Sequence, residues 1–178
     1  MNRYRRPRVA HVLPSLEHGG TQRQLISLLS AMDHDRLEHL VVTLHEAGPL
    51  ADRLPDAVAC HPLGLPRPSR LAGLRLAGLL RRQRGDILHA RNTCTWLDAT
   101  LAKAWYPAVS LVLGFHGFDA GTELSPAQRR KTILARGAGG RFTSVSHHGA
   151  ELLHDQARVP RSMITVLPNG IDLERFTP

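Results

Sequence analysis

Few aromatic residues, few cysteines and almost no lysine occur in this sequence of 178 residues. Cys60 and Cys94 form no ligand-spaced pair, which argues against a disulfide framework or a zinc knuckle, so we expect both to be buried small apolar residues. Long apolar runs are also missing. The longest, at residues 108–115, is interrupted by Ser110 and Gly114 and cannot span a bilayer.

The composition that remains is that of one ordinary globular domain. With 42% hydrophobic and 21% charged residues, 15 Gly and 12 Pro, the chain is too apolar for a disordered protein and not rich enough in Gly and Pro for a fibrous one. The apolar stretch at residues 9–13 contains His11 and stops at Pro14, which does not match a signal peptide. We therefore expect a cytoplasmic domain, with peripheral membrane contact left open.

Positive charge is in excess, with a formal net charge of +8. Of the 23 Lys and Arg residues only Lys103 and Lys131 are lysine, which leaves 21 arginines. Guanidinium groups bind phosphate and carboxylate bidentately, although codon bias also produces an excess of arginine. The basic runs at residues 3–8 and 129–131 have no aromatic stacking platform beside them, so we expect no nucleic-acid partner. An anionic membrane surface fits these runs better.

Segments of strand length alternate with segments of helical periodicity from end to end. Strands are predicted at residues 8–14, 38–45, 58–63, 86–90, 110–115, 142–146 and 163–167. Helices are predicted after Thr21 as N-cap and at residues 71–84, 95–105, 126–137 and 147–156. Leu71, Leu74 and Gly78 share one face of their helix. This order predicts an α/β fold with a Rossmann-like, doubly wound, mostly parallel sheet of about seven strands and helices on both faces.

In such a sheet the ligand lies outside the carboxyl ends of the strands, where the strand order reverses. Gly19 and Gly20 follow the first strand, where backbone N–H groups at a helix N-terminus favour an anion; a tight turn is the alternative. His89, Arg91 and Asn92 end or follow the fourth strand and could direct donors into the crevice. The alternative is a solvated Arg91 with Asn92 as a helix start.

Further polar residues follow the later strands. His116 comes directly after the fifth strand, and Asp119 is close enough in sequence for a polar contact or an acid–base pair. The adjacent pair His147 and His148 lacks the spacing that would place both rings on one helix face, so we expect no metal site. No dinucleotide fingerprint and no nucleophile elbow are present.

Five segments together carry a family resemblance. They are SLEHGGTQR at residues 15–23, DILHARN at 86–92, FHG at 115–117, SVS at 144–146 and VLPNGIDLERF at 166–176. In this order they resemble the N-terminal half of a family-four retaining glycosyltransferase with the GT-B fold. The last segment is the most specific, and the resemblance covers nearly the whole chain.

The resemblance implies an enzyme of two Rossmann-like domains with the active site in the cleft between them. Residues 1–168 would form the N-terminal domain, which binds a glycan or lipid-linked acceptor. Residues 169–178, including Asn169 and Gly170, would begin the interdomain hinge. The nucleotide-sugar donor would bind a C-terminal domain that is missing from this sequence. No cofactor or metal is expected, because the nucleotide sugar is a substrate.

The resemblance also assigns site residues by position. His116 would be the catalytic contact to the donor sugar near the reacting carbon. Gly19 and Gly20 would face the donor diphosphate and sugar. The acceptor side would be lined by Arg91, Asn92 and Asp119.

The basic residues and paired glutamates that hold the leaving diphosphate in this family belong to its C-terminal domain. We therefore expect the isolated chain to have no transferase activity, since stabilising that diphosphate is the main electrostatic task of the reaction. The alternatives are a stand-alone module that binds a glycan or lipid acceptor, or one subunit of a split transferase. Whether the reading frame continues beyond Pro178 separates them.

Overall fold

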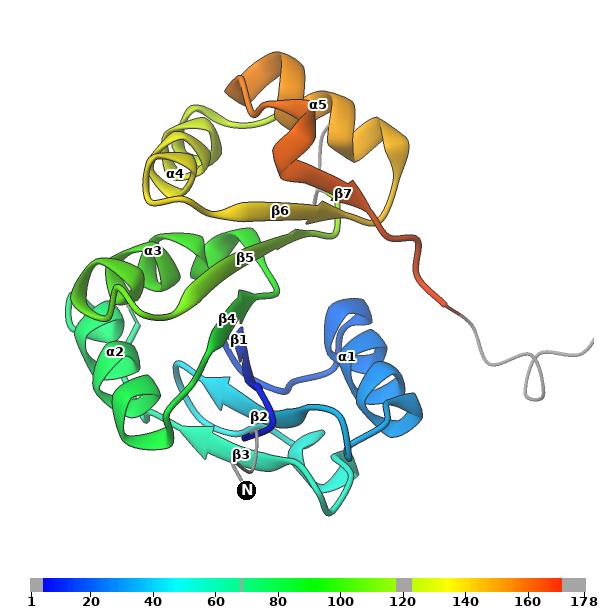
Figure 1. Cartoon of the computed structure of the whole chain (residues 1–178), viewed down its shortest axis with the longest axis vertical. Helices are drawn as coiled ribbons and strands as arrows, with labels where there is room; N and C mark the ends of the chain where they lie inside the picture. The colour runs from blue at the N-terminus through cyan, green and yellow to red at the C-terminus, as the bar shows by residue number, and fades with distance from the viewer. Residues whose placement is uncertain (1–4, 68, 118–122, 171–178) are drawn as a thin grey trace, which may run out of the picture.

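The computed structural model describes residues 5–67, 69–117 and 123–170 (Figure 1). Strands and helices alternate along this part of the chain. The strands are β1 (Arg8–Leu13), β2 (Glu38–Thr43), β3 (Ala59–Pro62), β4 (Ile87–Ala90), β5 (Ser110–Phe115), β6 (Arg141–Ser144) and β7 (Ile164–Val166). The α-helices are α1 (Gly20–Ala31), α2 (Ala72–Gln83), α3 (Trp96–Trp105), α4 (Pro126–Gly137) and α5 (His147–Ala157). Short 3-10 helices are η1 (Ala51–Arg53), η2 (Thr93–Thr95) and η3 (Arg161–Met163).

The strands form one parallel sheet in the order β3-β2-β1-β4-β5-β6-β7. From β1 the chain winds outward through β2 to β3, and it then returns to β4 on the other side of β1. The predicted Rossmann-like, doubly wound sheet is confirmed. No observed strand end differs by more than two residues from its predicted position.

The helices cover the sheet in two layers. Parallel strands are joined by right-handed crossovers, so the change of winding direction at β1 changes the face on which the helices lie. Figure 1 accordingly shows α1 on one face and α2 to α5 on the other, as predicted. Among the described helices, none is both long and apolar enough to cross a bilayer.

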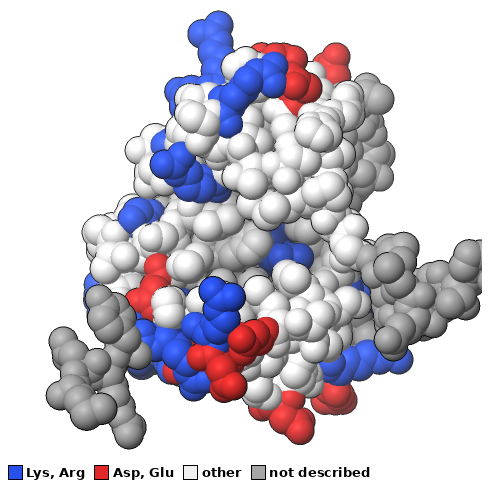
Figure 2. All heavy atoms as spheres, turned by 45° about the vertical axis from the view of Figure 1, so that its right-hand side comes forward, with Lys and Arg blue, Asp and Glu red and all other residues white. Residues whose placement is uncertain are grey.

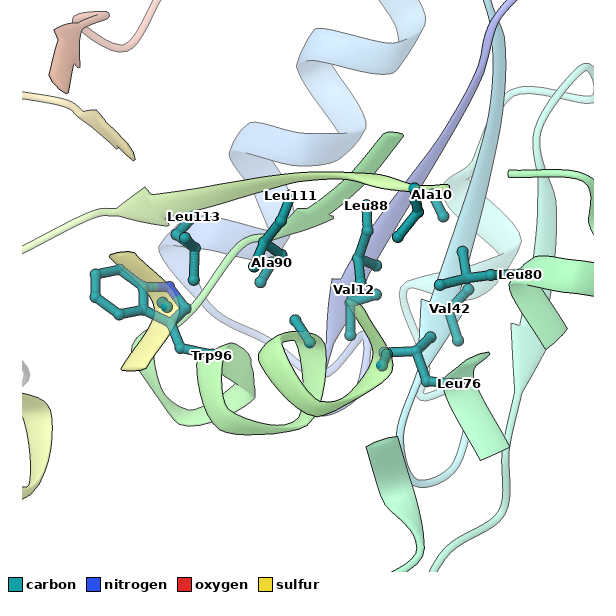
Figure 3. Packing of buried hydrophobic residues seen from close by; sticks show 14 of the residues in the cluster. Ala10, Val12, Val42, Leu76, Leu80, Leu88, Ala90, Trp96, Leu111 and Leu113 are labelled. Carbon is teal, nitrogen blue, oxygen red and sulfur yellow. The ribbon is translucent and has the colours of Figure 1, made fainter. Parts of the chain in front are cut away.

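The larger core lies between the sheet and the layer of α2 to α5. Figure 3 shows Ala10, Val12, Leu88 and Ala90 of the two central strands turned toward the same layer of helices. Trp96, at the start of α3, is fully buried and packs on aromatic rings from two strands. Its ring centroid lies 6.3 Å from that of Phe115 and 5.7 Å from that of Phe142. A smaller core, which includes Leu25 and Leu29 of α1, covers the opposite face.

The leucines of α2 lie on two faces of the helix, and only one of these faces turns inward. Leu71, just before the helix, and Leu74 are 52% and 48% exposed, while the buried face carries Leu76 and Leu80. Close packing against α3 fixes the rotation, because a methyl group on Gly73 would lie 2.6 Å from Leu101 Cβ. A helix with leucines on two faces does not indicate from sequence alone which of them meets the core.

The expected burial of the cysteines is incorrect in part. Cys60, on the edge strand β3, is half-buried, and Cys94, in η2, is exposed.

The helix starts that the sequence assigns to serine N-caps are confirmed. Ser125 accepts a hydrogen bond from Gln128 N at 3.2 Å, and Ser146 accepts one from Gly149 N at 3.0 Å.

Gly149 and Gly137 provide a matched test of this packing. A methyl group on Gly149 would lie 2.5 Å from Ser144 Oγ and 3.0 Å from the Phe115 ring, whereas no heavy atom lies within 4 Å of the equivalent position on Gly137. Gly149→Ala should lower the free energy of unfolding by about 1–3 kcal/mol, as overpacking does. Gly137→Ala should be neutral or stabilise by up to about 1 kcal/mol through helix propensity. Urea unfolding measures both, and equal effects would contradict the packing described.

Candidate functional site

The carboxyl ends of β1 and β4 meet where the winding direction reverses. The N–H of Arg91, the residue after β4, donates to Val12 O of β1 at 3.0 Å, so the two strand ends are held side by side. Open crevices in such sheets lie at this position. Figure 2 shows that the surface is hollowed between α1 and the part of the molecule that carries β6, β7 and α5, and Lys or Arg atoms are visible in the hollow.

The first side of the site is the N-terminus of α1. Gly19 is the N-cap and the helix begins at Gly20, so the prediction of Thr21 as N-cap is wrong by two positions. The backbone of Gly19 is extended, with φ −171°, and neither glycine has a positive φ, so the tight-turn alternative finds no support. No side chain caps the helix and its first turn carries no acidic residue. Its N–H groups can therefore serve a ligand, and the space beside Gly20 is open.

Arg91 is the most unusual group at the strand ends. Its side chain is only 6% exposed, and its buried Nε has no hydrogen-bond partner among the described residues. No carboxylate of the described chain forms an ion pair with it. Burial lowers the pKa of its guanidinium to about 10, which still leaves the group charged at neutral pH. The alternative of a solvated Arg91 is therefore incorrect.

Asn92 occupies the N-cap position of η2, as the helix-start alternative predicts, yet its side chain makes no cap bond. Instead, Thr95 N and Thr95 Oγ1 both donate to Asn92 O, at 2.9 and 2.8 Å. The side-chain Oδ1 of Asn92 is buried without a partner among the described residues. The carboxamide is therefore available to a ligand that reaches it.

His116 lies close to His89 above Gly114. A methyl group on Gly114 would lie 3.2 Å from the Nε2 atoms of both imidazoles. Burial, followed by the charge of Arg91, lowers the pKa of His116 to about 4. Its imidazole is therefore neutral at pH 7, when one nitrogen donates and the other accepts. Gly117 then has a φ of +101°, which favours glycine, and Asp119 lies outside the described residues.

Three histidines form a row across the central strands that the sequence reasoning missed. The Nε2 of His11 lies 3.2 Å from Nδ1 of His39, and the His11 ring centroid lies 5.5 Å from that of His89. His89 is half-buried in the sheet beside His11, and burial lowers its pKa to about 3. The row follows from the parallel register of β1 and β4, which pairs His11 with His89. This register can be derived from the sequence only once the order of the strands is known.

The predicted hinge lies beside α1. Asn169 and Gly170 are exposed after β7, and Gln24 Nε2 of α1 donates to Gly170 O at 3.3 Å. Next to the strand ends, a cleft of about 690 Å³ opens between η2 and the start of α4, with Thr93, Ser125 and Lys131 among its lining. Within the described ranges, no three His, Cys, Asp or Glu side chains are grouped as metal ligands would be.

Comparison with known families assigns this fold. A model of Glycosyltransferase Family 4 matches residues 18–175. The chain belongs to glycosyltransferase family 4. The match includes Gly19 and Gly20 at the start of α1, the residues that follow β4 and β5, and most of the segment after β7. The resemblance noted in the sequence is confirmed.

One curated relative of this family 4 domain is an Escherichia coli enzyme, UDP-Gal:alpha-D-GlcNAc-diphosphoundecaprenol alpha-1,3-galactosyltransferase. It is 25% identical over 189 residues, which cover 96% of this chain and 46% of the relative. The family 4 domain thus spans about half the length of the curated relative that it matches.

Solved structures show the same relationship in space. A glycosyltransferase from Rickettsia africae ESF-5 has a TM-score of 0.78 at 15% identity, covering 98% of this chain and 46% of that one. Anabaena Alr3699/HepE in complex with UDP and glucose has a TM-score of 0.70 at 19% identity, covering 93% and 45%. The family 4 domain has the fold of one Rossmann-like half of a GT-B glycosyltransferase.

The buried histidines predict a loss of stability in acid. Burial, and then neighbouring positive groups, hold the pKa of His11 well below its ordinary value of 6.5, and those of His39 and His89 are lowered too. The unfolded chain therefore binds protons near pH 6.5 while the folded chain does not. The free energy of unfolding should be unaffected by these groups above about pH 7. It should fall by about 2 kcal/mol per fully buried imidazole between about pH 6.5 and pH 5.

Urea titrations at several pH values measure this dependence. His11→Gln should make the loss smaller by about 2 kcal/mol, the share of one imidazole, because Gln does not titrate. His148→Gln, at an exposed position of α5, is the control and should leave the loss as in the parent chain. An equal pH dependence in His11→Gln and the parent chain would contradict the assignment.

Proposed function

We propose that this chain is the acceptor-binding half of a retaining glycosyltransferase that transfers a sugar from a nucleotide-sugar donor to a glycan or lipid-linked acceptor. Family membership supports the reaction class. The printed name of the Escherichia coli relative, with a UDP-linked galactose donor and a diphosphate-linked acceptor, supports the substrate classes. The observation that carries the proposal is the meeting of the α1 N-terminus, Arg91 and His116 at the strand ends of a family 4 fold.

In this proposal the two edges of the site have different tasks. The uncapped N-terminus of α1, at Gly19 and Gly20, faces the donor diphosphate and sugar with backbone N–H groups. His116 contacts the donor sugar near the reacting carbon. Because its pKa is about 4, it acts as a neutral hydrogen-bonding group rather than as a general acid. The acceptor approaches past Arg91, Asn92 and Asp119, and the cleft beside η2 gives it room.

The second half of the site belongs to a donor-binding domain joined through Asn169 and Gly170. The hydrogen bond from Gln24 to Gly170 O keeps the start of this hinge against α1, one helical turn after Gly20. A departing nucleoside diphosphate carries negative charge that positively charged groups must stabilise in the transition state. In family 4 those groups lie in the donor-binding domain.

The domain would work in the cytoplasm with peripheral contact to an anionic membrane. On α2 and α3, Leu74, Leu101 and Trp105 are 48%, 42% and 60% exposed. Arg81 of α2 donates to Trp105 O at 3.0 Å and lies 5.7 Å from the Tyr106 ring centroid, so basic and aromatic groups are held together on this surface. Exposed apolar residues beside arginines favour binding at the interface of anionic lipids.

The isolated chain should be inactive. Incubated with UDP-galactose or UDP-glucose and a diphosphate-linked sugar acceptor, the 178 residues should release no UDP and form no product above background. The reason is the missing stabilisation of the leaving diphosphate. Product formation that His116→Ala abolishes would overturn this division of the site.

His116 is tested in the longest reading frame that contains this chain. His116→Ala should lower kcat about a hundredfold, as loss of one transition-state hydrogen bond does, with a smaller change in KM. His148→Ala, at an exposed position in the first turn of α5, is the control and should retain activity. Equal activity of the two variants would remove His116 from the site.

Membrane contact is tested by co-sedimentation with liposomes. The chain should bind vesicles that contain phosphatidylglycerol more strongly than neutral phosphatidylcholine vesicles. Trp105→Ser combined with Leu101→Ser should abolish most of this binding without loss of folding, because Trp105 is 60% and Leu101 42% exposed and the Cβ of Leu101, which packs beside Gly73, is retained. Equal binding to neutral and anionic vesicles would contradict the proposal.

A further inference from the structure

We infer that Arg91 and His116 form a binding site for a phosphoryl oxyanion, supplied by a glycosyl phosphate or diphosphate that enters the crevice. The inference deepens the proposed function, and it rests on that function only for the identity of the substrate that carries the phosphate. The binding site itself stands on the burial and surroundings of the two side chains.

The first observation is the contrast between Arg91 and the other arginines. Arg161, 63% exposed at its side chain, makes two hydrogen bonds of 2.6 Å to the carboxylate of Glu151. Arg5, at the other end of the chain, lies 2.6 Å from Asp86 Oδ1. Arg91 is the most buried of these three and has no acidic partner in the described part of the chain. A buried charge without a counterion lowers stability, so its presence calls for a ligand.

The second observation is the sign of the groups around Arg91. Its charge helps to lower the pKa of His11, His89 and His116, which extend from β1, β4 and the end of β5. The described surroundings of the guanidinium therefore supply neutral donors and acceptors and no negative charge. An anion would be the first negative group beside Arg91 among the described residues.

The third observation is the convergence of two imidazole nitrogens above Gly114. His116 Nε2 and His89 Nε2 approach the same point, 3.2 Å from the place of a methyl group on that glycine, and His89 Nε2 has no partner in the described residues. Ala90 O, in the residue before Arg91, lies 3.5 Å from the same point, so the start of Arg91 is close to both imidazoles. In the tautomers that carry the proton on Nε2, the two imidazoles and the guanidinium offer N–H groups to an oxyanion. Arginine binds phosphate oxygens through a planar set of donors, so a phosphate fits this site better than a halide ion does.

The site also predicts a link between anion and proton. An oxyanion beside Arg91 cancels the positive field that helps to hold His116 neutral, so binding should raise the pKa of that imidazole. Removal of Arg91 should raise it as well, without any ligand. The groups that face His116 in the described chain are Arg91 and His89, and Asp119 lies outside the described residues.

Titration of the isolated chain with inorganic pyrophosphate tests the site directly. Calorimetry should detect binding, and Arg91→Met should weaken it at least about tenfold, the effect of losing a charged hydrogen bond. Arg75→Met, on the exposed face of α2, is the matched control and should bind as the parent does. Histidine NMR should show the pKa of His116 rising with pyrophosphate and in Arg91→Met.

Thermal unfolding separates a ligand-binding Arg91 from a structural one. Without pyrophosphate, Arg91→Met should unfold at the same temperature as the parent or a higher one, since it removes an unpaired buried charge. A lower unfolding temperature for Arg91→Met that Asp119→Asn reproduces, with no added effect in the double variant, would identify Asp119 as the counterion and overturn the inference.

The source of the phosphate is assigned with two further probes, N-acetylglucosamine 1-phosphate and UDP. Binding of the sugar phosphate that depends on Arg91 places the acceptor in the site, and Arg91-dependent binding of UDP alone places the donor there; either supports the oxyanion site. The inference is overturned if the parent chain binds none of pyrophosphate, the sugar phosphate and UDP, or if Arg91→Met binds them as tightly as the parent does. Failure of the proposed transfer reaction in the longest reading frame would leave the pyrophosphate result unaffected, so the two can be judged separately.

Discussion

The reversal of winding between β1 and β4 is the constraint on which the rest of the molecule depends. It places α1 on one face and α2 to α5 on the other, because right-handed crossovers allow no other arrangement. It also brings the ends of two neighbouring strands together while the chain leaves them in opposite directions. The hydrogen bond from Arg91 N to Val12 O fixes that meeting point. A crevice with polar ends therefore follows from the same topology that forms the two hydrophobic cores.

The chemistry at this point conflicts with stability. Neutral histidines lie along β1, β2 and β4, with His11 and His39 buried, and the charged Arg91 lies near them without a described counterion. An apolar replacement of these groups would pack in a sheet at least as well. Groups that reduce stability and have no structural partner mark positions where the site, rather than the fold, determines the residue.

Much of this arrangement could be predicted from periodicity and turn chemistry. The alternation of strands and helices, the serine caps of α4 and α5 and the residues at the strand ends all follow from local sequence. The features that local sequence does not indicate depend on interactions between elements or on a cap without a side chain. The inward face of α2 depends on contact with α3 at Gly73, the histidine row depends on the register of β1 with β4, and the start of α1 at Gly20 rather than after Thr21 depends on a cap without a side chain. That Arg91 is buried without a described counterion can be recognised only from the positions of the side chains around it.

The arginines differ in what they contribute to binding, depending on whether each one is exposed and paired or buried. Net charge cannot distinguish a nucleic-acid surface from an anion site, because it adds paired and unpaired groups together. In the structure, exposed arginines such as Arg5 and Arg161 are neutralised by carboxylates on the surface, so they contribute little to recognition. Arg91 is screened from water and keeps its field within the crevice, where an interaction with a phosphate is strengthened by the low dielectric. One buried cation at the strand ends therefore bears more on the function of this domain than the total of the surface charges.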